Sequence, residues 1–198
     1  MALDTSALNR QRHNLDHLDD VWLFGYGSLI YKVDFPYLEQ RVATIEGWAR
    51  RFWQGSHDHR GTPESPGRVA TLVEAPGVEC MGVAYRVSPR TFEHLDHREK
   101  NGYLRFFTPL WFSEEESVDG LVYVAGADNA AFLGPAPVDE MAEQIARSHG
   151  PSGPNADYLL KLAGALSEMG ATMNTSLSWQ GWLRISLWPG RDPASPPR

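Results

Sequence analysis

Short apolar runs separated by turn residues fill the first two thirds of the chain. Val21–Phe24 is a compact apolar run, Val69–Glu74 is rich in β-branched residues, and apolar residues occupy every second position of Met81–Val87. Such a period of two is typical of a half-buried strand. Further strands are predicted at Tyr103–Phe112 and Asp119–Ala125, whereas Arg41–Trp48 and Ala49–Gln54 mix apolar and polar residues. The Gly- and Pro-containing stretch 57–68 predicts a loop, long enough to be functional.

After residue 20, helical spacing appears at three places. Ser88 is a suitable N-cap, with Pro89 in the first turn, for a helix through Phe92 and Leu95 that places Glu99 at or just past its end. Two more helices are expected near the C-terminal end. Their apolar stripes are Val138, Met141, Ala142 and Ile145, with Gly150 as a stop, and Leu159, Leu162, Ala163 and Leu166, with Asn155 as N-cap and Gly170 as a stop. Residues 150–154 are expected to form a rigid linker. Strands followed by packed helices indicate an α+β fold, with a small closed or partly closed barrel.

The pattern divides the chain into three parts. Residues 1–20 are polar and predict a weak helix in an N-terminal extension, residues 21–170 form one domain, and residues 171–198 form a C-terminal segment. That segment contains Trp179, Trp182 and Trp188, which we expect to pack on the domain, and ends in a Pro-rich tail from Asp192 that we expect to be disordered. With 198 residues, of which 42% are hydrophobic, one substantial core is expected.

Charge and targeting patterns narrow the class of protein. The net charge of −7, without a basic cluster, disfavours nucleic acid or an anionic membrane as the main partner. The first twenty residues contain no apolar stretch of a signal peptide, and no run is long enough for a membrane span. We therefore expect a soluble cytoplasmic protein. Cys80, the single cysteine, lies in an apolar alternating stretch and is expected to be a buried, reduced thiol.

Tyr26-Gly27-Ser28-Leu29 is the most informative short motif. It follows an apolar strand, and the glycines at positions 25 and 27 permit a tight turn with free backbone N–H groups. Such a nest can bind a carboxylate, a phosphate or an oxyanion. The alternative is a hairpin turn with a packed aromatic residue. A dinucleotide fingerprint, a phosphate loop and a nucleophile elbow all require residues that are missing here, so Ser28 is not expected to be acylated.

Glu99 is the second candidate, because it lies between Arg98 and Lys100. By itself this triplet would indicate a surface salt bridge. Histidines 57, 59, 94 and 97 suggest a metal site, but the His-Glu-x-x-His motif is absent and a single cysteine makes no zinc knuckle. Loop and surface histidines are the better interpretation, and no metal is expected.

Ten ordered blocks from about Val21 to Gly170 resemble the ChaC-type γ-glutamylcyclotransferases, the glutathione-specific branch of that fold. The blocks are Phe24–Ile30, Arg50–Ser56, Asp58–Gly61, Pro66–Val69, Gly82–Arg86, Leu95–Asp96, Arg98–Tyr103, Tyr123–Val124, Leu133–Pro135, and Gly150–Gly153 with Tyr158–Leu159. The first twenty residues and the segment after Gly170 depart from the family pattern.

The resemblance implies a barrel-like mixed sheet with flanking helices, and a lyase that degrades glutathione to 5-oxoproline and cysteinylglycine without cofactor or metal. It implies Glu99 as the catalytic acid/base, Tyr26–Leu29 as the γ-glutamyl-binding loop, and Tyr158 in the substrate site. Tyr103 and Arg51 complete the predicted substrate-binding residues. Arg50, Arg60 and Arg68 are alternatives to Arg51 as partners of the substrate carboxylates. A monomer or weak homodimer is expected.

In this reaction the α-amine of the γ-glutamyl group attacks its own γ-carbonyl, so proximity is built into the substrate. One carboxylate can accept and later donate the proton. Glu99 suits this role if it is partly buried, since desolvation raises the pKa of a carboxyl group. Arg98 and Lys100 would oppose that effect and are expected to point away. The rival interpretations are the same reaction on another γ-glutamyl donor, a non-catalytic module that binds γ-glutamyl peptides, and metal-dependent hydrolysis.

Overall fold

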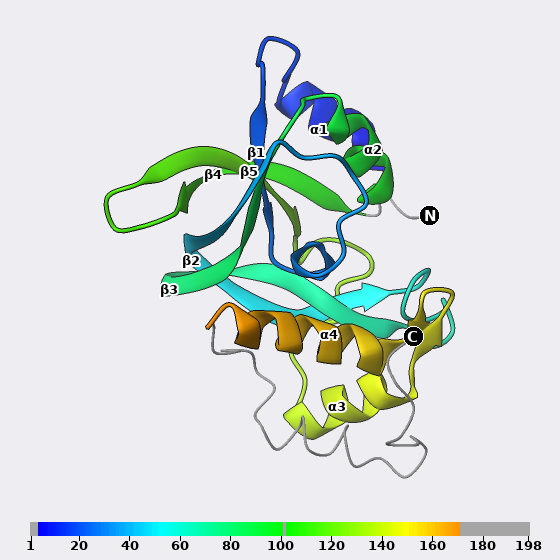
Figure 1. Ribbon diagram of the computed structural model, residues 1–198. Coiled ribbons are helices and arrows are strands. Elements are labelled where there is room, and N and C mark those ends of the chain that lie inside the picture. The colour runs from blue at the N-terminus through cyan, green and yellow to red at the C-terminus, as the bar shows by residue number, and fades with distance from the viewer. Residues whose placement is uncertain (1–3, 101, 171–198) are drawn as a thin grey trace. The chain divides into compact units, whose positions relative to one another are not determined.

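The computed structural model describes residues 4–100 and 102–170 (Figure 1). The chain divides into two compact units. Unit 1 comprises Met1–Arg50 and Thr71–Phe132, and unit 2 comprises Arg51–Ala70 and Leu133–Arg198. Residues 171–198, with Trp179, Trp182, Trp188 and the Pro-rich tail, lie outside the described residues.

A closed barrel with strand order β1-β3-β2-β4-β5 forms the main sheet. Its strands are β1 (Val21–Gly25), β2 (Glu39–Ser56), β3 (Gly67–Val87), β4 (Tyr103–Trp111) and β5 (Ser117–Ala125). β1 runs antiparallel to β3 and parallel to β5. β4 and β5 form an antiparallel hairpin from Tyr103↔Ala125 to Trp111↔Ser117. The predicted α+β fold with a mixed, barrel-like sheet is confirmed.

β2 and β3 are longer than the sequence pattern predicts. The pattern divides each into two segments, but β2 and β3 are continuous over 18 and 21 residues. Each strand contains a glycine at positive φ, Gly47 at 79° and Gly77 at 78°. Because glycine adopts this conformation at little steric cost, a strand can bend there without ending. The last part of β2, from Arg51, and the first part of β3, to Ala70, belong to unit 2.

The core of unit 1 consists largely of strand residues. Leu23, Phe24, Ile45, Tyr85 and Leu121 are each at most 1% exposed. Burial of one such side chain contributes roughly 1.5–3 kcal/mol. β1 and β5 bury consecutive residues, so the core extends beyond the positions that a period of two would bury. Cys80 is buried, as predicted, and forms no disulfide within the described residues.

Helices α1 (Ser6–Arg12) and α2 (Thr91–Arg98) lie side by side in unit 1 (Figure 1). Glu99 is the C-cap of α2, which confirms its predicted place at the helix end. The N-cap is Arg90 and not Ser88. The Ser88 and Pro89 carbonyls each accept a hydrogen bond from the backbone N–H three residues further along the chain. Ser88 and Pro89 therefore form a turn that precedes the helix.

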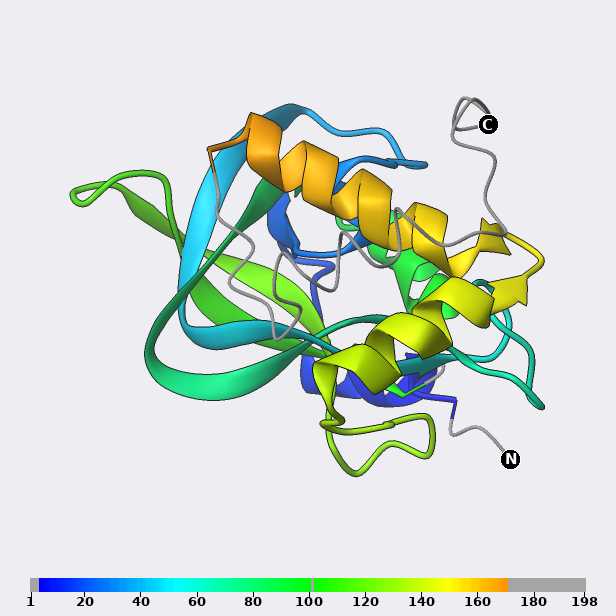
Figure 2. The same cartoon turned by 90° about the horizontal axis from the view of Figure 1, so that it is seen from below.

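Unit 2 contains α3 (Val138–Arg147) and α4 (Asn155–Glu168), which pack on each other (Figure 2). Most residues of the predicted stripes are buried, among them Met141, Ile145, Leu159 and Leu162, whereas Tyr158 is buried outside the predicted stripe. The residues between the helices form a short hairpin, β6 (His149–Gly150) and β7 (Gly153–Pro154), where a rigid linker was expected. Gly150 therefore lies in a strand, and α3 ends earlier, with Ser148 as its C-cap.

The ends of α4 give one confirmed and one wrong prediction. Gly170 follows the helix with φ of 77°, which suits a left-handed stop. Asn155 is the first helical residue, and the N-cap is Pro154. The side-chain amide of Asn155 instead accepts a hydrogen bond from the Arg68 N–H at 2.6 Å and donates one to the Arg68 carbonyl at 2.8 Å. Asn155 therefore binds the backbone of Arg68 and does not cap the helix.

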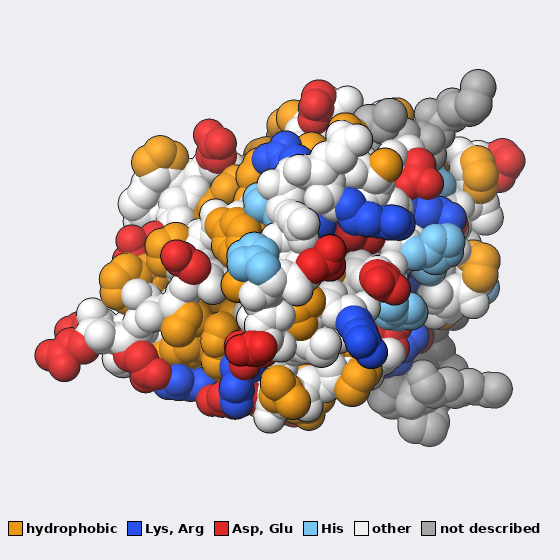
Figure 3. Space-filling view, turned by 90° about the horizontal axis from the view of Figure 1, so that it is seen from above, with side chains coloured by type: hydrophobic (Ala, Val, Ile, Leu, Met, Phe, Trp, Pro, Cys, Tyr) orange, Lys and Arg blue, Asp and Glu red, His pale blue; other side chains and the backbone are white. Residues whose placement is uncertain are grey.

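The surface of the described residues carries charges of both signs. Figure 3 shows acidic, basic and histidine side chains interspersed on the face seen from above. Within the described residues, none of the helices has the length and apolar character required to cross a membrane.

Candidate active site

The segment Tyr26–Leu29 turns sharply after β1 and enters η1 (Ser28–Ile30), a single 3-10 turn with Gly27 as its N-cap. Gly25 permits this turn, because a Cβ atom there would lie 2.7 Å from the Cβ of Leu29. The Gly27 and Ser28 carbonyls accept hydrogen bonds from Ile30 and Tyr31. The N–H groups at the beginning of such a turn have no partner within it. The binding of an anion by these groups stays a prediction.

Buried side chains hold this loop in place. The Tyr26 carbonyl accepts from Arg50 Nε at 2.6 Å, and the Tyr26 hydroxyl donates to the Tyr123 carbonyl at 2.8 Å. The Tyr85 hydroxyl donates to the Leu29 carbonyl at 2.6 Å, and burial raises the Tyr85 pKa to about 12, which keeps this donor protonated. Tyr26 is 7% exposed and is therefore a structural anchor of the loop.

Glu99 lies at the end of α2 with a side chain that is 21% exposed. Its Oε1 atom is 3.2 Å from Nε of Arg98. Its backbone N–H donates to the Leu95 carbonyl at 2.8 Å, and its carbonyl accepts from the Tyr103 N–H at 3.3 Å. The carboxylate is thus partly shielded from water and sits on backbone that is hydrogen-bonded on both sides.

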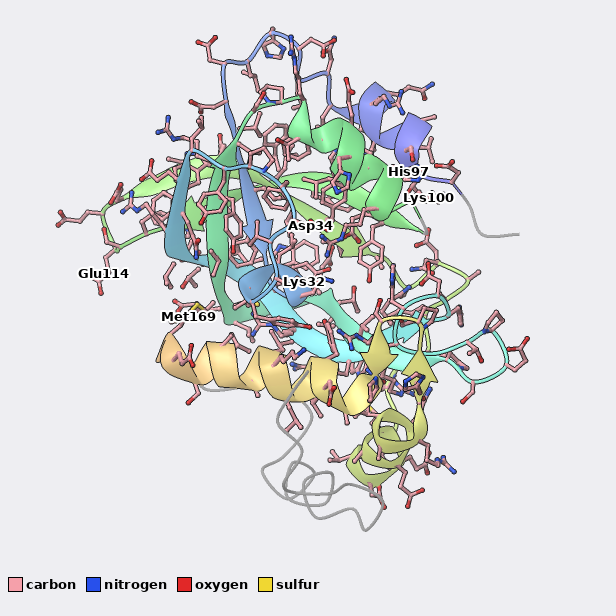
Figure 4. The ribbon with its side chains drawn as sticks, turned by 45° about the vertical axis from the view of Figure 1, so that its right-hand side comes forward. Lys32, Asp34, His97, Lys100, Glu114 and Met169 are labelled. Atoms are coloured by element: carbon pink, nitrogen blue, oxygen red, sulfur yellow. The ribbon has the colours of Figure 1, made fainter. Side chains whose placement is uncertain are left out.

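Arg98 connects Glu99 with the loop. Its Nη2 donates to Ser28 Oγ at 3.1 Å, and its Nη1 donates to Asp34 Oδ1 at 2.7 Å. Figure 4 labels Asp34 on the segment that follows η1. One guanidinium therefore contacts the carboxylate of Glu99 and the hydroxyl of Ser28, and the two sequence motifs share one site in unit 1.

The expectation that Arg98 points away from Glu99 is wrong. Ser28 and Asp34 supply acceptors on the loop side, and a guanidinium has enough donors to bind them together with the Glu99 carboxylate. Lys100 differs from Arg98, because its charge acts on Asp4, where it is one of the smaller causes that lower the pKa. A backbone hydrogen bond from Ser6 is the largest cause of that shift.

A buried polar network lies behind the loop. The Tyr123 hydroxyl donates to Asp96 Oδ1 at 2.6 Å, and Arg105 Nε lies 3.5 Å from the same oxygen. Asp96 is 1% and Arg105 is 2% exposed. Burial raises the pKa of Asp96 and also that of Tyr123. Since the Tyr123 carbonyl accepts a hydrogen bond from the Tyr26 hydroxyl, the network joins the loop to α2.

The remaining predicted substrate-binding residues fall in both units. Tyr103, the first residue of β4, is in unit 1, and its N–H bonds the Glu99 carbonyl. Arg51 and Tyr158 are in unit 2. The Tyr158 hydroxyl accepts from the Ala70 N–H at 3.1 Å, and the Arg51 guanidinium lies 5.9 Å from the Trp53 ring centroid. Their role in substrate binding stays a prediction.

The alternative arginines are engaged with backbone carbonyls. Arg50 Nη2 donates to the Met81 carbonyl, and Arg68 Nη1 donates to the carbonyls of Phe52 and Gly134. Arg60 donates to the Pro154 carbonyl at 3.2 Å. Arg50 and Arg68 are buried, so both have clear structural roles.

Sequence reasoning missed Arg98, Asp34 and Tyr85 as parts of the site. The signal for Tyr85 was its alternation in β3, which indicated only burial. Among the described residues, no group of three or more His, Cys, Asp or Glu side chains could hold a metal ion.

The closed barrel with its flanking helices is a γ-glutamylcyclotransferase-like fold. The model of the ChaC-like protein family matches residues 21–178, and the chain belongs to this family.

Curated relatives agree with this assignment. The chain is 46% identical over 162 residues to "Gamma-glutamylcyclotransferase 2-3" of Arabidopsis thaliana, covering 76% of this chain and 81% of the relative. It is 44% identical to "Glutathione-specific gamma-glutamylcyclotransferase 1" of Danio rerio over 72% of this chain and 77% of the relative. A Saccharomyces cerevisiae relative named "Glutathione-specific gamma-glutamylcyclotransferase" is 38% identical over 75% of this chain and 86% of its own length.

Solved structures support the same fold. A crystal structure of the yeast γ-glutamyl cyclotransferase specific to glutathione superposes with a TM-score of 0.74 and 34% identity, covering 85% of this chain and 96% of that one. A structure titled "Gamma-glutamyl cyclotransferase" gives a TM-score of 0.53 at 16% identity over 91% of this chain and 94% of that one, which is a likeness of fold alone.

Proposed function

We propose that this protein is a lyase that cleaves glutathione into 5-oxoproline and cysteinylglycine. The carrying observation is the Arg98 guanidinium, which contacts both Glu99 Oε1 and Ser28 Oγ. This guanidinium contacts both the carboxylate suited to proton transfer, that of Glu99, and the loop whose backbone N–H groups are suited to bind an oxyanion. The names of the Danio rerio and yeast relatives support glutathione as the substrate.

Glu99 acts as the general base and then as the general acid. It accepts a proton from the α-ammonium of the γ-glutamyl group, and the freed amine attacks the γ-carbonyl carbon of the same group. The bond to the cysteine nitrogen then breaks as Glu99 returns this proton to the leaving nitrogen. The attacking nitrogen loses its second proton to the released amine, which leaves the lactam N–H of 5-oxoproline and the ammonium group of cysteinylglycine. Proton transfer of this kind contributes roughly 10²–10⁴-fold to a rate.

The Tyr26–Leu29 loop binds the γ-glutamyl carbonyl. The oxyanion that develops on the attacked carbonyl is stabilised by N–H groups of Gly27, Ser28 and Leu29, which lie at the beginning of η1. Arg50 and Tyr85 fix the carbonyls of this loop, so its N–H groups need little reorganisation during the reaction.

Arg98 gives Glu99 a positive neighbour. A guanidinium 3.2 Å from the carboxylate favours its ionised form, which is the form that accepts a proton. Its second contact, to Ser28, keeps the carboxylate close to the loop. Arg98 is therefore a positioning residue in this proposal.

An assay with product identification tests the function. Purified protein incubated with reduced glutathione should release equal amounts of 5-oxoproline and cysteinylglycine, without added metal. A panel that includes oxidised glutathione and γ-glutamylalanine compares donors by kcat/KM. Absence of 5-oxoproline with every donor over a range of pH would refute the proposal, and sensitivity to a chelator would favour metal-dependent hydrolysis instead.

Location and assembly complete the proposal. We infer a cytoplasmic protein that works as a monomer or weak homodimer and has no nucleic-acid partner. The net charge of −7 supports the lack of a nucleic-acid partner. Light scattering after size-exclusion chromatography would test the assembly state, and an obligate oligomer would contradict it.

A further inference from the structure

The N-terminal segment is hydrogen-bonded to the chain on both sides of Glu99. Thr5 uses its backbone N–H and its hydroxyl to donate to the Lys100 carbonyl, each at 3.0 Å. The Ser6 hydroxyl donates to the Asp96 carbonyl at 3.1 Å. Asn9 Nδ2 donates to the Tyr103 carbonyl at 3.1 Å. We call Thr5, Ser6 and Asn9 the N-terminal clamp.

The side chains of the clamp are buried, and its bond to Asp96 is buried, whereas its bonds to Lys100 and Tyr103 are partly buried. Thr5 is 1%, Ser6 is 9% and Asn9 is 0% exposed. A buried hydrogen bond that loses one partner leaves the other unsatisfied, which costs more than the bond itself contributes. The clamp therefore restrains its partners more firmly than exposed contacts would.

The same segment reaches the network behind the loop. Asn9 accepts from the backbone N–H of Arg105 at 2.9 Å, and its carbonyl accepts from the Arg105 guanidinium. Arg105 pairs with Asp96, which binds Tyr123. Figures 1 and 4 show α1 beside α2, at whose end His97 and Lys100 are labelled.

The clamp lies before the region that defines the family. The family model begins at residue 21, whereas all three clamp residues lie in or next to α1. The segment expected from sequence to be only a polar extension thus contacts the residues at positions 96, 100 and 103, which bracket Glu99.

We propose that the N-terminal clamp is a positioning device for Glu99, which fixes the turn between α2 and β4 and thereby the carboxylate that transfers the proton. This inference rests on the proposed function. Removal of one clamp bond should lower kcat more than it changes KM, because a small misplacement of a catalytic group can cost up to about 10²-fold in rate.

The test compares two Thr→Val substitutions that remove the same kind of bond. Thr5→Val removes the hydroxyl donor to the Lys100 carbonyl, and Thr71→Val removes the hydroxyl donor to the Ala125 carbonyl; both bonds are 3.0 Å long. Thr71 is 0% exposed and lies in the same unit. Thr5→Ser keeps the hydroxyl donor that Thr5→Val removes. Ser6→Ala is a second variant that removes only the bond to Asp96.

Steady-state kinetics with glutathione are measured together with the free energy of unfolding of each variant. We expect kcat to fall about tenfold in Thr5→Val and several-fold in Ser6→Ala, with KM within twofold of the wild type. Thr5→Ser should recover most of kcat, and Thr71→Val should lose stability without a comparable loss of kcat.

Other outcomes overturn the inference. An unchanged kcat in both clamp variants, or an equal loss in Thr71→Val, would show that the segment contributes only stability. If Thr5→Val does not fold, the Ser6→Ala kinetics decide alone. A wild type that releases no 5-oxoproline refutes the proposed function and the clamp's role with it, whereas an active wild type with unaffected variants refutes only the clamp.

Discussion

Arg98 Nε and Glu99 Oε1 lie 3.2 Å apart, although the two residues are neighbours in sequence and either side chain could have turned to solvent. The arginine is held by Ser28 and Asp34, which come from the other side of the site. The Arg98–Glu99 pair therefore depends on the packing of α2 against the segment after β1. Its charges lie where we propose that the proton is transferred.

Replacement of Arg98 by Met should lower kcat/KM about tenfold, which corresponds to about 1.4 kcal/mol. Charge-assisted hydrogen bonds contribute about 1.5–3 kcal/mol each, so this loss is modest for a group with three partners. Arg98→Lys should be intermediate, because an ammonium lacks the planar fork that reaches several acceptors. Steady-state kinetics with glutathione measure the effect.

Asp34→Asn is the matched control for Arg98, since it weakens the contact of Arg98 with Asp34 and keeps the contacts with Ser28 and Glu99. It should lose less activity than Arg98→Met. Wild-type kinetics in Arg98→Met would show that the guanidinium has no part in positioning the carboxylate.

Glu99→Gln should retain the fold and bind glutathione but lose kcat by roughly 10²–10⁴-fold, because the amide cannot accept the proton. Glu93→Gln, an exposed change in the first turn of the same helix, serves as the control and should keep wild-type kcat. Calorimetry with glutathione separates binding from turnover. A Glu99→Gln variant with normal kcat would remove Glu99 from the mechanism.

Local patterns predicted the elements that carry the site. Apolar alternation in Met81–Val87 matches the end of β3, and the helix through Phe92 and Leu95 does place Glu99 at its C-cap. These features depend on neighbours in sequence, which is why a single chain reveals them. The role of Glu99 and of the Tyr26–Leu29 loop came from the family resemblance and stays a prediction for the residues themselves.

Contacts between residues that are distant in sequence determine the features that the sequence pattern did not predict. Asn155 was a reasonable helix cap, yet it binds the backbone of Arg68, 87 residues away. The direction of Arg98 depends on Ser28, 70 residues away. The polar segment with Asn9 looked like an extension because its burial requires partners on β4. Polar side chains with such distant partners leave no periodic signal.

Gly25→Ala should lower kcat about tenfold while the protein still folds. The added Cβ would lie 2.7 Å from Leu29 Cβ, so the loop must shift, and small displacements of reacting groups are costly. Gly164→Ala in α4 is the control, because nothing lies within 4 Å of its Cβ position. There the change should raise stability by up to about 1 kcal/mol without an effect on kcat. A Gly25→Ala variant with wild-type kcat would show that the shape of the loop is unimportant.

Asp96 should make stability depend on pH in a defined direction. Burial raises its pKa above the ordinary value of 3.8 in the folded protein, so the folded state binds this proton more tightly than the unfolded state. Its stabilising contribution is complete below pH 3.8 and is lost as the pH rises through the raised value. Over that window the slope reaches at most about 1.4 kcal/mol per pH unit.

Denaturant unfolding of the wild type and Asp96→Asn over this pH range measures the effect. The free energy of unfolding of the wild type relative to Asp96→Asn should fall as the pH rises. A difference that grows with pH would mean that Tyr123 and Arg105, which oppose the effect of burial, determine the charge state of Asp96.

Tyr158 provides a test of the substrate-binding residues in unit 2. Its hydroxyl accepts from the Ala70 N–H at 3.1 Å and the side chain is 5% exposed, so Tyr158→Phe should lower the free energy of unfolding by about 1 kcal/mol. If the hydroxyl also contacts glutathione, as the family resemblance implies, KM should rise about three- to tenfold, since a lost neutral hydrogen bond costs about 0.5–1.5 kcal/mol. We expect both effects. A variant that loses stability with an unchanged KM would assign Tyr158 to packing alone, and Thr71→Val shows how far KM responds to a stability loss elsewhere in the chain.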